Sequence, residues 1–118
     1  MKTILIVEDH KDMQEVYKDI LSEKYALVTV NNTQDAKKAL EKKKIDLMIL
    51  DIILPDESGD SFLVNMAENN KYDNLPVIAI TVLGDVSTQL KNIKPNVICI
   101  PKPFDKRQLL KTIKQMLP

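Results

Sequence analysis

The sequence has little cysteine, few aromatic residues and no excess charge of either sign. Its single Cys excludes a disulfide framework and a cysteine-rich metal site. Lys and Arg number 17, Asp and Glu also number 17, and Trp is absent, so the sequence lacks the basic surface and stacking aromatic residues of a nucleic-acid-binding protein. No apolar run approaches the ~20 residues of a membrane span, and Glu8 comes too early for a secretory signal. We therefore expect a cytoplasmic protein with no direct nucleic-acid or membrane partner.

What the sequence does contain is a regular alternation of two hydrophobic periods. Short apolar runs, typical of buried strands, occupy residues 3–7, 26–30, 47–50, 77–80 and 97–100. Apolar residues with helical spacing occupy residues 13–21, 36–40, 58–68, 85–93 and 109–117, with Asp12, residues 31–33 and Asp105 as expected helix starts. A length of 118 residues suits one domain and not two. We expect residues 1–118 to form a single α/β domain, a doubly wound parallel sheet with helices on both faces.

Polar side chains gather where the predicted strands end. Because parallel strands all end at one edge of a sheet, the residues that follow them share this edge, where open α/β sheets bind ligands. These residues are Glu8 and Asp9 after the first strand, Asp51 after the third, Thr81 after the fourth and Lys102 after the fifth. Taken singly, each has an ordinary explanation: a solvated loop for the acidic pair, a local cap for Thr81, a solvent-facing side chain for Lys102. Their joint placement on one edge favours a functional site.

Three carboxylates at one edge predict a cation. At a few ångström each pair repels by several kcal/mol at the dielectric of a protein, and a hard divalent ion removes this cost. Mg²⁺ binds carboxylate oxygens and leaves positions for waters and phosphate oxygens. Lys102 and Thr81 suit the remaining oxygens of a phosphoryl group, and Asp51 between them is a candidate nucleophile, since carboxylates form acyl phosphates.

In these residues the whole chain resembles the receiver domain of two-component response regulators. Glu8 and Asp9 match the family's acidic pair, Asp51 its phosphoacceptor, Thr81 its hydroxyl switch and Lys102 its lysine. Pro55, Gly59 and the tripeptide 102–104 match supporting positions. The resemblance implies the flavodoxin-like receiver fold with strand order 2-1-3-4-5, and a cis bond between Lys102 and Pro103.

The resemblance also implies a function. A sensor histidine kinase or histidine phosphotransfer protein would donate a phosphoryl group to Asp51. Mg²⁺ would be held by Asp9, Asp51 and the backbone carbonyl of Ile53, with Glu8 acting through water. Lys102 and a movement of Thr81 would then change the surface of the fourth helix, fifth strand and fifth helix, and so the binding of a downstream protein target or an attached output domain. Such a domain is a phosphoacceptor that assists its own phosphotransfer, and not an enzyme in the usual sense.

The chain departs from the family pattern at four positions. Cys99 stands where an aromatic residue often couples the switch to the surface, and Val82 stands where a very small residue is usual. Ile53 and Leu83, two residues after Asp51 and Thr81, cannot hydrogen-bond an attacking water. We expect slow self-dephosphorylation; measured loss of the phosphoryl group within seconds would contradict this.

Three other functions remain to be weighed. A Mg²⁺-dependent phosphohydrolase with an aspartyl nucleophile would need a second acid where Ile53 stands. An FMN carrier would place a phosphate where Glu8 and Asp9 repel it. A free-standing receiver-like docking module acting without phosphorylation would not need all five chemical positions filled. His10, which follows the acidic pair, is expected to be a loop residue beside the site, the less favoured alternative being a residue that modulates it.

Overall fold

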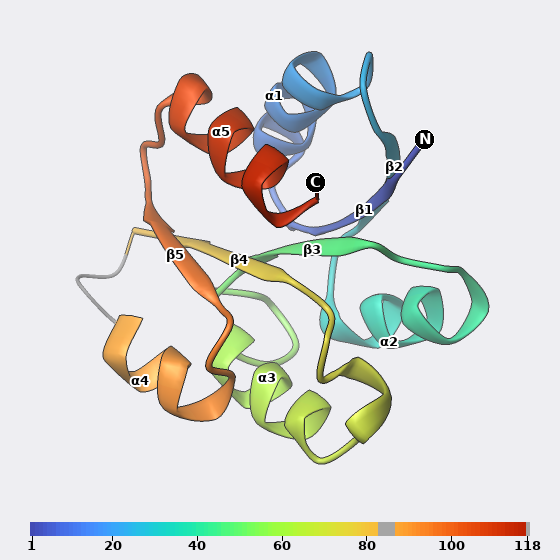
Figure 1. Cartoon of the computed structure of the whole chain (residues 1–118), viewed down its shortest axis with the longest axis vertical. Coiled ribbons are helices and arrows are strands. Elements are labelled where there is room, and N and C mark those ends of the chain that lie inside the picture. Colours follow the sequence, from blue (N-terminus) through green and yellow to red (C-terminus); the bar gives the residue numbers. More distant parts are fainter. Residues whose placement is uncertain (83–86, 118) are drawn as a thin grey trace.

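The computed structural model describes residues 1–82 and 87–117, whose strands form one parallel sheet (Figure 1). The strands are β1 (Thr3–Val7), β2 (Ala26–Val30), β3 (Leu47–Asp51), β4 (Val77–Thr81) and β5 (Ile98–Pro101). Their order in the sheet is β2-β1-β3-β4-β5, and each neighbouring pair is parallel. The predicted α/β fold and strand order are therefore confirmed, and all strands end at one edge.

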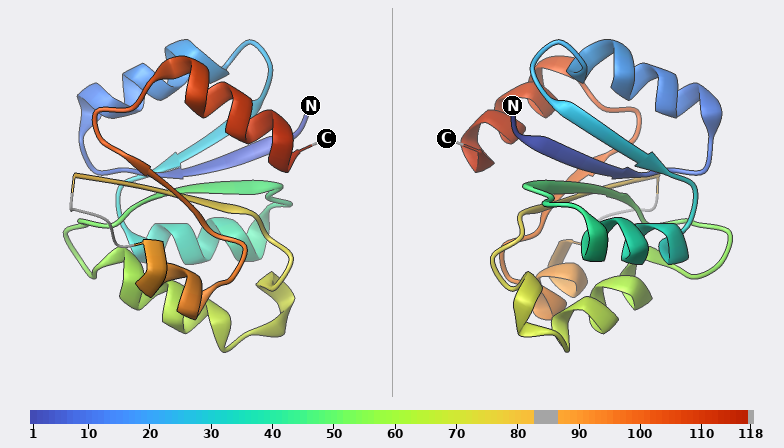
Figure 2. Two further views of the ribbon diagram at one scale, coloured as in Figure 1. Left: turned by 60° about the vertical axis from the view of Figure 1, so that its left-hand side comes forward. Right: turned by 90° about the vertical axis from the view of Figure 1, so that its right-hand side faces the viewer.

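Helices cover both faces of the sheet (Figures 1 and 2). The helices are α1 (Lys11–Leu21), α2 (Thr33–Lys42), α3 (Gly59–Ala67), α4 (Ser87–Ile93), α5 (Lys106–Met116) and the short 3₁₀ helix η1 (Asn70–Tyr72). Figure 1 shows α1 and α5 on one face and α2, α3 and α4 on the other. Among the described residues, no helix is long and apolar enough to cross a membrane.

The sheet separates two hydrophobic cores because side chains alternate along each strand. In β1, Leu5 and Val7 pack with α2 and α3, whereas Ile4 and Ile6 pack with α1 and α5. Every residue of β3 and β4 is buried, as their continuous apolar runs predict for central strands. Asp51 and Thr81 extend these two strands by one residue beyond the apolar runs and are buried with them.

The start of α1 corrects one prediction. The N-cap is His10 and not Asp12: the Gln14 N–H donates to the His10 carbonyl at 3.1 Å, so the helix begins at Lys11. The Gln14 side-chain amide also donates to the Glu8 carbonyl, which closes the first turn directly behind β1. Asp12 lies in that first turn, where its negative charge suits the positive end of the helix dipole.

Other predicted boundaries differ by small amounts. Strand β5 begins at Ile98 because the Val97 N–H donates to the Lys94 carbonyl at 3.1 Å and so belongs to the preceding turn. The helix predicted over residues 85–93 is seen from Ser87, and the first two of these residues lie outside the described part of the chain. The peptide bond between Lys102 and Pro103 is cis, as predicted.

Candidate functional site

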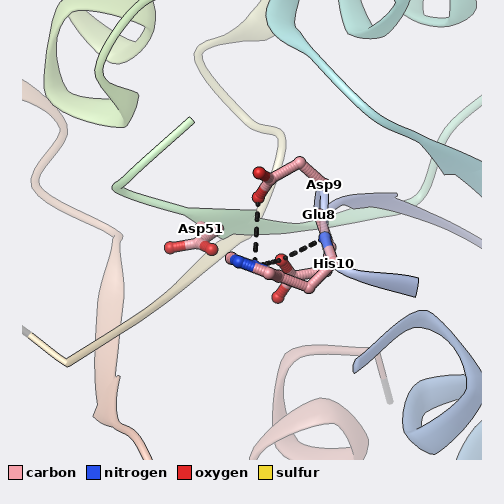
Figure 3. A group of neighbouring side chains, drawn as sticks. All are labelled: Glu8, Asp9, His10 and Asp51. Atoms are coloured by element: carbon pink, nitrogen blue, oxygen red, sulfur yellow. Dashed lines mark hydrogen bonds and ion pairs between the residues drawn. The ribbon is translucent and has the colours of Figure 1, made fainter. Parts of the chain in front are cut away.

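The carboxyl edge of the sheet brings four potential metal ligands together. Glu8, Asp9, His10 and Asp51 each offer one ligand atom, and these atoms lie within 4.8 Å of one another (Figure 3). Their proximity follows from the sheet register: Val7 of β1 pairs with Leu50 of β3, so the residues that follow each lie side by side. The predicted convergence of the three acidic residues is therefore seen in the structure.

Lys102 reaches into this cluster from the end of β5. Its Nζ donates hydrogen bonds to Glu8 Oε1 at 3.0 Å and to Asp51 Oδ2 at 3.1 Å. The Lys102 N–H donates to the Thr81 carbonyl at 2.9 Å, which fixes the start of the side chain beside β4. Glu8 is 1 % exposed and Asp51 is 5 % exposed, so the single Lys102 ammonium hydrogen-bonds two buried carboxylates.

The surroundings shift the pKa of Asp51 and of Lys102 in the same direction. Burial raises the pKa of Asp51, and the negative charge of Glu8 adds to this, against the opposing effects of the Ile53 N–H and Lys102. Burial lowers the pKa of Lys102, but its hydrogen bonds to Glu8 and Asp51 outweigh this and raise the pKa above its ordinary value. The raised pKa of Lys102 keeps its ammonium charged beside these two carboxylates.

This cluster fits a divalent cation. The buried Oδ1 atom of Asp9 accepts no hydrogen bond from the described residues. A buried carboxylate oxygen without a hydrogen bond is costly, and a hard cation is a partner that satisfies it together with neighbouring carboxylates. The Asp9 atom lies 3.3 Å from His10 Nδ1, a contact that is an ion pair only when the imidazole is protonated. Asp9, Asp51 and Glu8 thus provide the oxygen ligands that Mg²⁺ prefers.

Two further predicted site residues lie next to Asp51. Thr81 is buried at the end of β4, in the strand adjacent to β3. The Ile53 N–H donates to Asp51 Oδ1 at 3.1 Å, and Ile53, which has an apolar side chain, is 49 % exposed. Leu83, which was predicted to leave an attacking water without a partner, lies outside the described residues. Cys99 is partly buried in β5 and packs against the core shared with α3 and α4.

A polar cluster that the sequence did not predict ties the loop after β3 to α2. The Asp56 carboxylate accepts hydrogen bonds from the Thr33 N–H and hydroxyl and from the Gln34 N–H, at 2.8–3.2 Å. Desolvation raises the pKa of Asp56, but the Thr33 hydroxyl and the backbone N–H groups outweigh this and hold the pKa at about 2. The carboxylate thus adds to the capping of α2, whose N-cap is Asn32, from a residue more than 20 positions away in the chain.

We expect Asp56→Ala to lower the free energy of unfolding by about 1–2 kcal/mol, because it removes the acceptor of the first two N–H groups of α2, although the Asn32 side chain still caps the helix. Since the folded-state pKa is depressed, this contribution is complete above about pH 4 and is lost as the pH falls towards about 2. Urea unfolding of both proteins at several pH values measures the difference. The control is Asp60→Ala, an exposed acid in the first turn of α3. An equal loss of stability in both variants would contradict the capping role.

Comparison with known proteins gives a family match over almost the whole chain. Residues 4–114 match the response regulator receiver domain. Similar proteins include the phosphate regulon transcriptional regulatory protein PhoB of Pseudomonas aeruginosa, 30 % identical over 98 % of this chain and 52 % of that protein. The hybrid signal transduction histidine kinase D of Dictyostelium discoideum is 26 % identical over 97 % of this chain and 7 % of that protein. The chain thus spans about half or much less of these relatives.

Solved structures show the same fold. The CheY-like response regulator receiver domain protein of Methanospirillum hungatei superposes with a TM-score of 0.87 at 27 % identity, covering 99 % of this chain and 94 % of the other. The signal receiver domain of an HD domain-containing protein of Pseudomonas fluorescens gives a TM-score of 0.89 at 24 % identity, covering 98 % and 94 %. At 24 % identity, this similarity shows the fold alone.

Proposed function

The chain belongs to the response regulator receiver domains of two-component signalling, and on this premise we propose that it is a switch that accepts a phosphoryl group on Asp51. The observation that carries the proposal is the pairing of Asp51 with Lys102 inside an acidic cluster at the carboxyl edge of the sheet. We treat residues 1–118 as one receiver domain. Its proposed donor is the phosphohistidine of a sensor histidine kinase or a histidine phosphotransfer protein in the cytoplasm.

The proposed transfer forms one bond and breaks one. An Asp51 carboxylate oxygen attacks phosphorus; the new O–P bond forms as the P–N bond of the phosphohistidine breaks, and the imidazole nitrogen keeps the electron pair. The Lys102 ammonium, already 3.1 Å from Asp51 Oδ2, balances the charge of the phosphoryl oxygens. Asp9, Asp51 and the Ile53 carbonyl would hold Mg²⁺, with Glu8 acting through water. When bound, this ion supplies positive charge that offsets the repulsion between the carboxylates and the incoming phosphoryl group.

The proposed output is a change in the surface formed by α4, β5 and α5. A phosphoryl group on Asp51 competes for the Lys102 ammonium, whose present bonds are to Glu8 and Asp51. Lys102 and Thr81 lie at the ends of β5 and β4, so a shift of either side chain acts on this surface. The surface would then bind a downstream protein target or an attached output domain differently. In this role the domain assists its own phosphotransfer and slow dephosphorylation and turns over no other substrate.

Incubation with acetyl phosphate and Mg²⁺ followed by intact mass measurement tests the proposal. We expect the wild-type chain to gain the mass of one phosphoryl group and Asp51→Asn to gain none, because an amide oxygen does not form the acyl phosphate. Asp60→Asn, at an exposed position of α3, is the matched control and should gain the group like the wild type. No gain by a wild-type chain that binds Mg²⁺ would overturn the proposal and leave the docking module that acts without phosphorylation.

A further inference from the structure

The imidazole of His10 lies on the acidic cluster. His10 Nδ1 is 3.2 Å from Glu8 Oε2 and 3.3 Å from Asp9 Oδ1, and Figure 3 shows the ring beside Asp51 as well. One nitrogen of the ring is among the four ligand atoms that lie within 4.8 Å of one another. The edge of the sheet therefore presents a nitrogen ligand together with its carboxylate oxygens.

The backbone holds His10 in this position although 69 % of its side chain is exposed. The His10 N–H donates to Glu8 Oε2 at 3.2 Å, and its carbonyl accepts the hydrogen bond that begins α1. The ring therefore starts from a fixed point between the end of β1 and the start of the helix. It needs only a rotation of its side chain to adjust to an ion.

His10 and Lys102 contact different oxygen atoms of the cluster. Lys102 Nζ is bonded to Glu8 Oε1 and Asp51 Oδ2, whereas His10 faces Glu8 Oε2 and Asp9 Oδ1. The Asp9 atom is the buried oxygen that accepts no hydrogen bond from the described residues. A cation between the imidazole and these two oxygens would satisfy that atom without displacing the lysine from its partners.

We propose that His10 is an additional metal ligand, and that the cluster binds a first-row transition-metal dication, such as Ni²⁺ or Co²⁺, through imidazole and carboxylate. Mg²⁺ takes oxygen ligands and gains little from an imidazole, whereas Ni²⁺, Co²⁺ and Zn²⁺ bind imidazole well. His10 thereby determines which metals compete for the site. The inference rests on the proposed function to the extent that the same carboxylates form the Mg²⁺ site.

Calorimetric titration of the full chain with Ni²⁺ and, separately, with Mg²⁺ tests the inference. Loss of a residue that only supports a metal ligand already costs roughly 10–100-fold in affinity, so His10→Ala should weaken Ni²⁺ binding by at least about tenfold. Its affinity for Mg²⁺ should stay within about twofold, because imidazole is a poor Mg²⁺ ligand. The control Lys11→Ala, at the exposed first residue of α1, should bind both ions like the wild type. The visible spectrum of bound Co²⁺ should change in His10→Ala and not in the control.

Two outcomes would overturn the inference. Equal Ni²⁺ affinity in the wild type and His10→Ala would show that the imidazole is no ligand. An equal loss for Ni²⁺ and Mg²⁺ would show that His10 only positions the carboxylates. This inference alone fails if Mg²⁺ binds and Asp51 takes up a phosphoryl group, but the affinity for Ni²⁺ is the same in the wild type and His10→Ala. If the wild type binds neither ion, the metal site of the proposed function fails with it.

Discussion

Lys102→Met is expected to lower the free energy of unfolding by about 3–5 kcal/mol in buffer without Mg²⁺, the range found when one partner of a buried ion pair is removed. Lys102 Nζ donates to Glu8 Oε1 and Asp51 Oδ2, and these two carboxylates are almost completely buried. Met keeps the length and apolar stem of the side chain, so the loss isolates the ammonium. Without it, two like charges share a site of low dielectric and lose the hydrogen bonds that this ammonium gave them.

Urea unfolding at neutral pH measures this effect, and three further samples define its cause. Lys111→Met, an exposed position of α5, should change stability by less than about 0.5 kcal/mol. Mg²⁺ should stabilise Lys102→Met more than the wild type, because a cation takes over part of the role of the ammonium. The double variant Lys102→Met with Asp51→Asn should regain part of the lost stability, since one buried charge is gone. If Lys102→Met has the same midpoint of urea unfolding as the wild type, the two buried carboxylates do not need the ammonium for stability.

The sheet and its functional edge could be predicted because both follow from local patterns. The apolar runs locate all five strands to within one residue, and a residue directly after a strand in a parallel sheet has only one edge to occupy. Glu8, Asp51 and Lys102 were placed at that edge for this reason, and the structure joins them by hydrogen bonds. The order of the strands came from the family resemblance and not from periodicity, which carries no information on which strands are neighbours.

Two features that the sequence did not predict, the Asp56 contacts and the burial of Lys94, depend on contacts between distant residues. The Asp56 cap on α2 joins a loop to a helix through polar atoms that leave no hydrophobic signature. Lys94 is buried where its Nζ donates to the Tyr72 and Asp73 carbonyls at the end of η1. The start of α1 is a different case, because the bonds that decide it are local. Acidic residues commonly cap helices and so favour Asp12, whereas the bonds from Gln14 to the His10 and Glu8 carbonyls set the start two residues earlier in the chain.

Gly59→Ala is expected to lower the free energy of unfolding by about 2–3 kcal/mol, within the range for adding an atom to a well-packed region. The cause is close approach and not backbone conformation, since Gly59 begins the helix α3 without a positive φ. A Cβ at this position would lie 2.7 Å from the Asp51 carbonyl oxygen and 2.8 Å from Ile52 Cα. Both are backbone atoms, so no side chain can rotate away to relieve the contact.

The same substitution should also weaken Mg²⁺ binding. The Gly59 N–H donates to the Ile52 carbonyl at 2.7 Å, so α3 is tied directly to the segment between Asp51 and Ile53. Relief of the clash must move either α3 or this segment, and the segment carries one carboxylate and one carbonyl of the proposed metal site. Calorimetric titration with Mg²⁺ and urea unfolding of Gly59→Ala measure the two effects, with Asp60→Ala as the matched control in the same turn.

The two measurements separate the possible responses to Gly59→Ala. Reduced stability with unchanged Mg²⁺ affinity would mean that α3 moves away and that Asp51 and Ile53 keep their places. Reduction of both is the expected result, because the Gly59 N–H bond to the Ile52 carbonyl makes the helix and the segment move together. Wild-type values for both would contradict the close packing of Gly59 against Asp51 and Ile52, and with it the idea that the start of α3 supports the proposed phosphoacceptor.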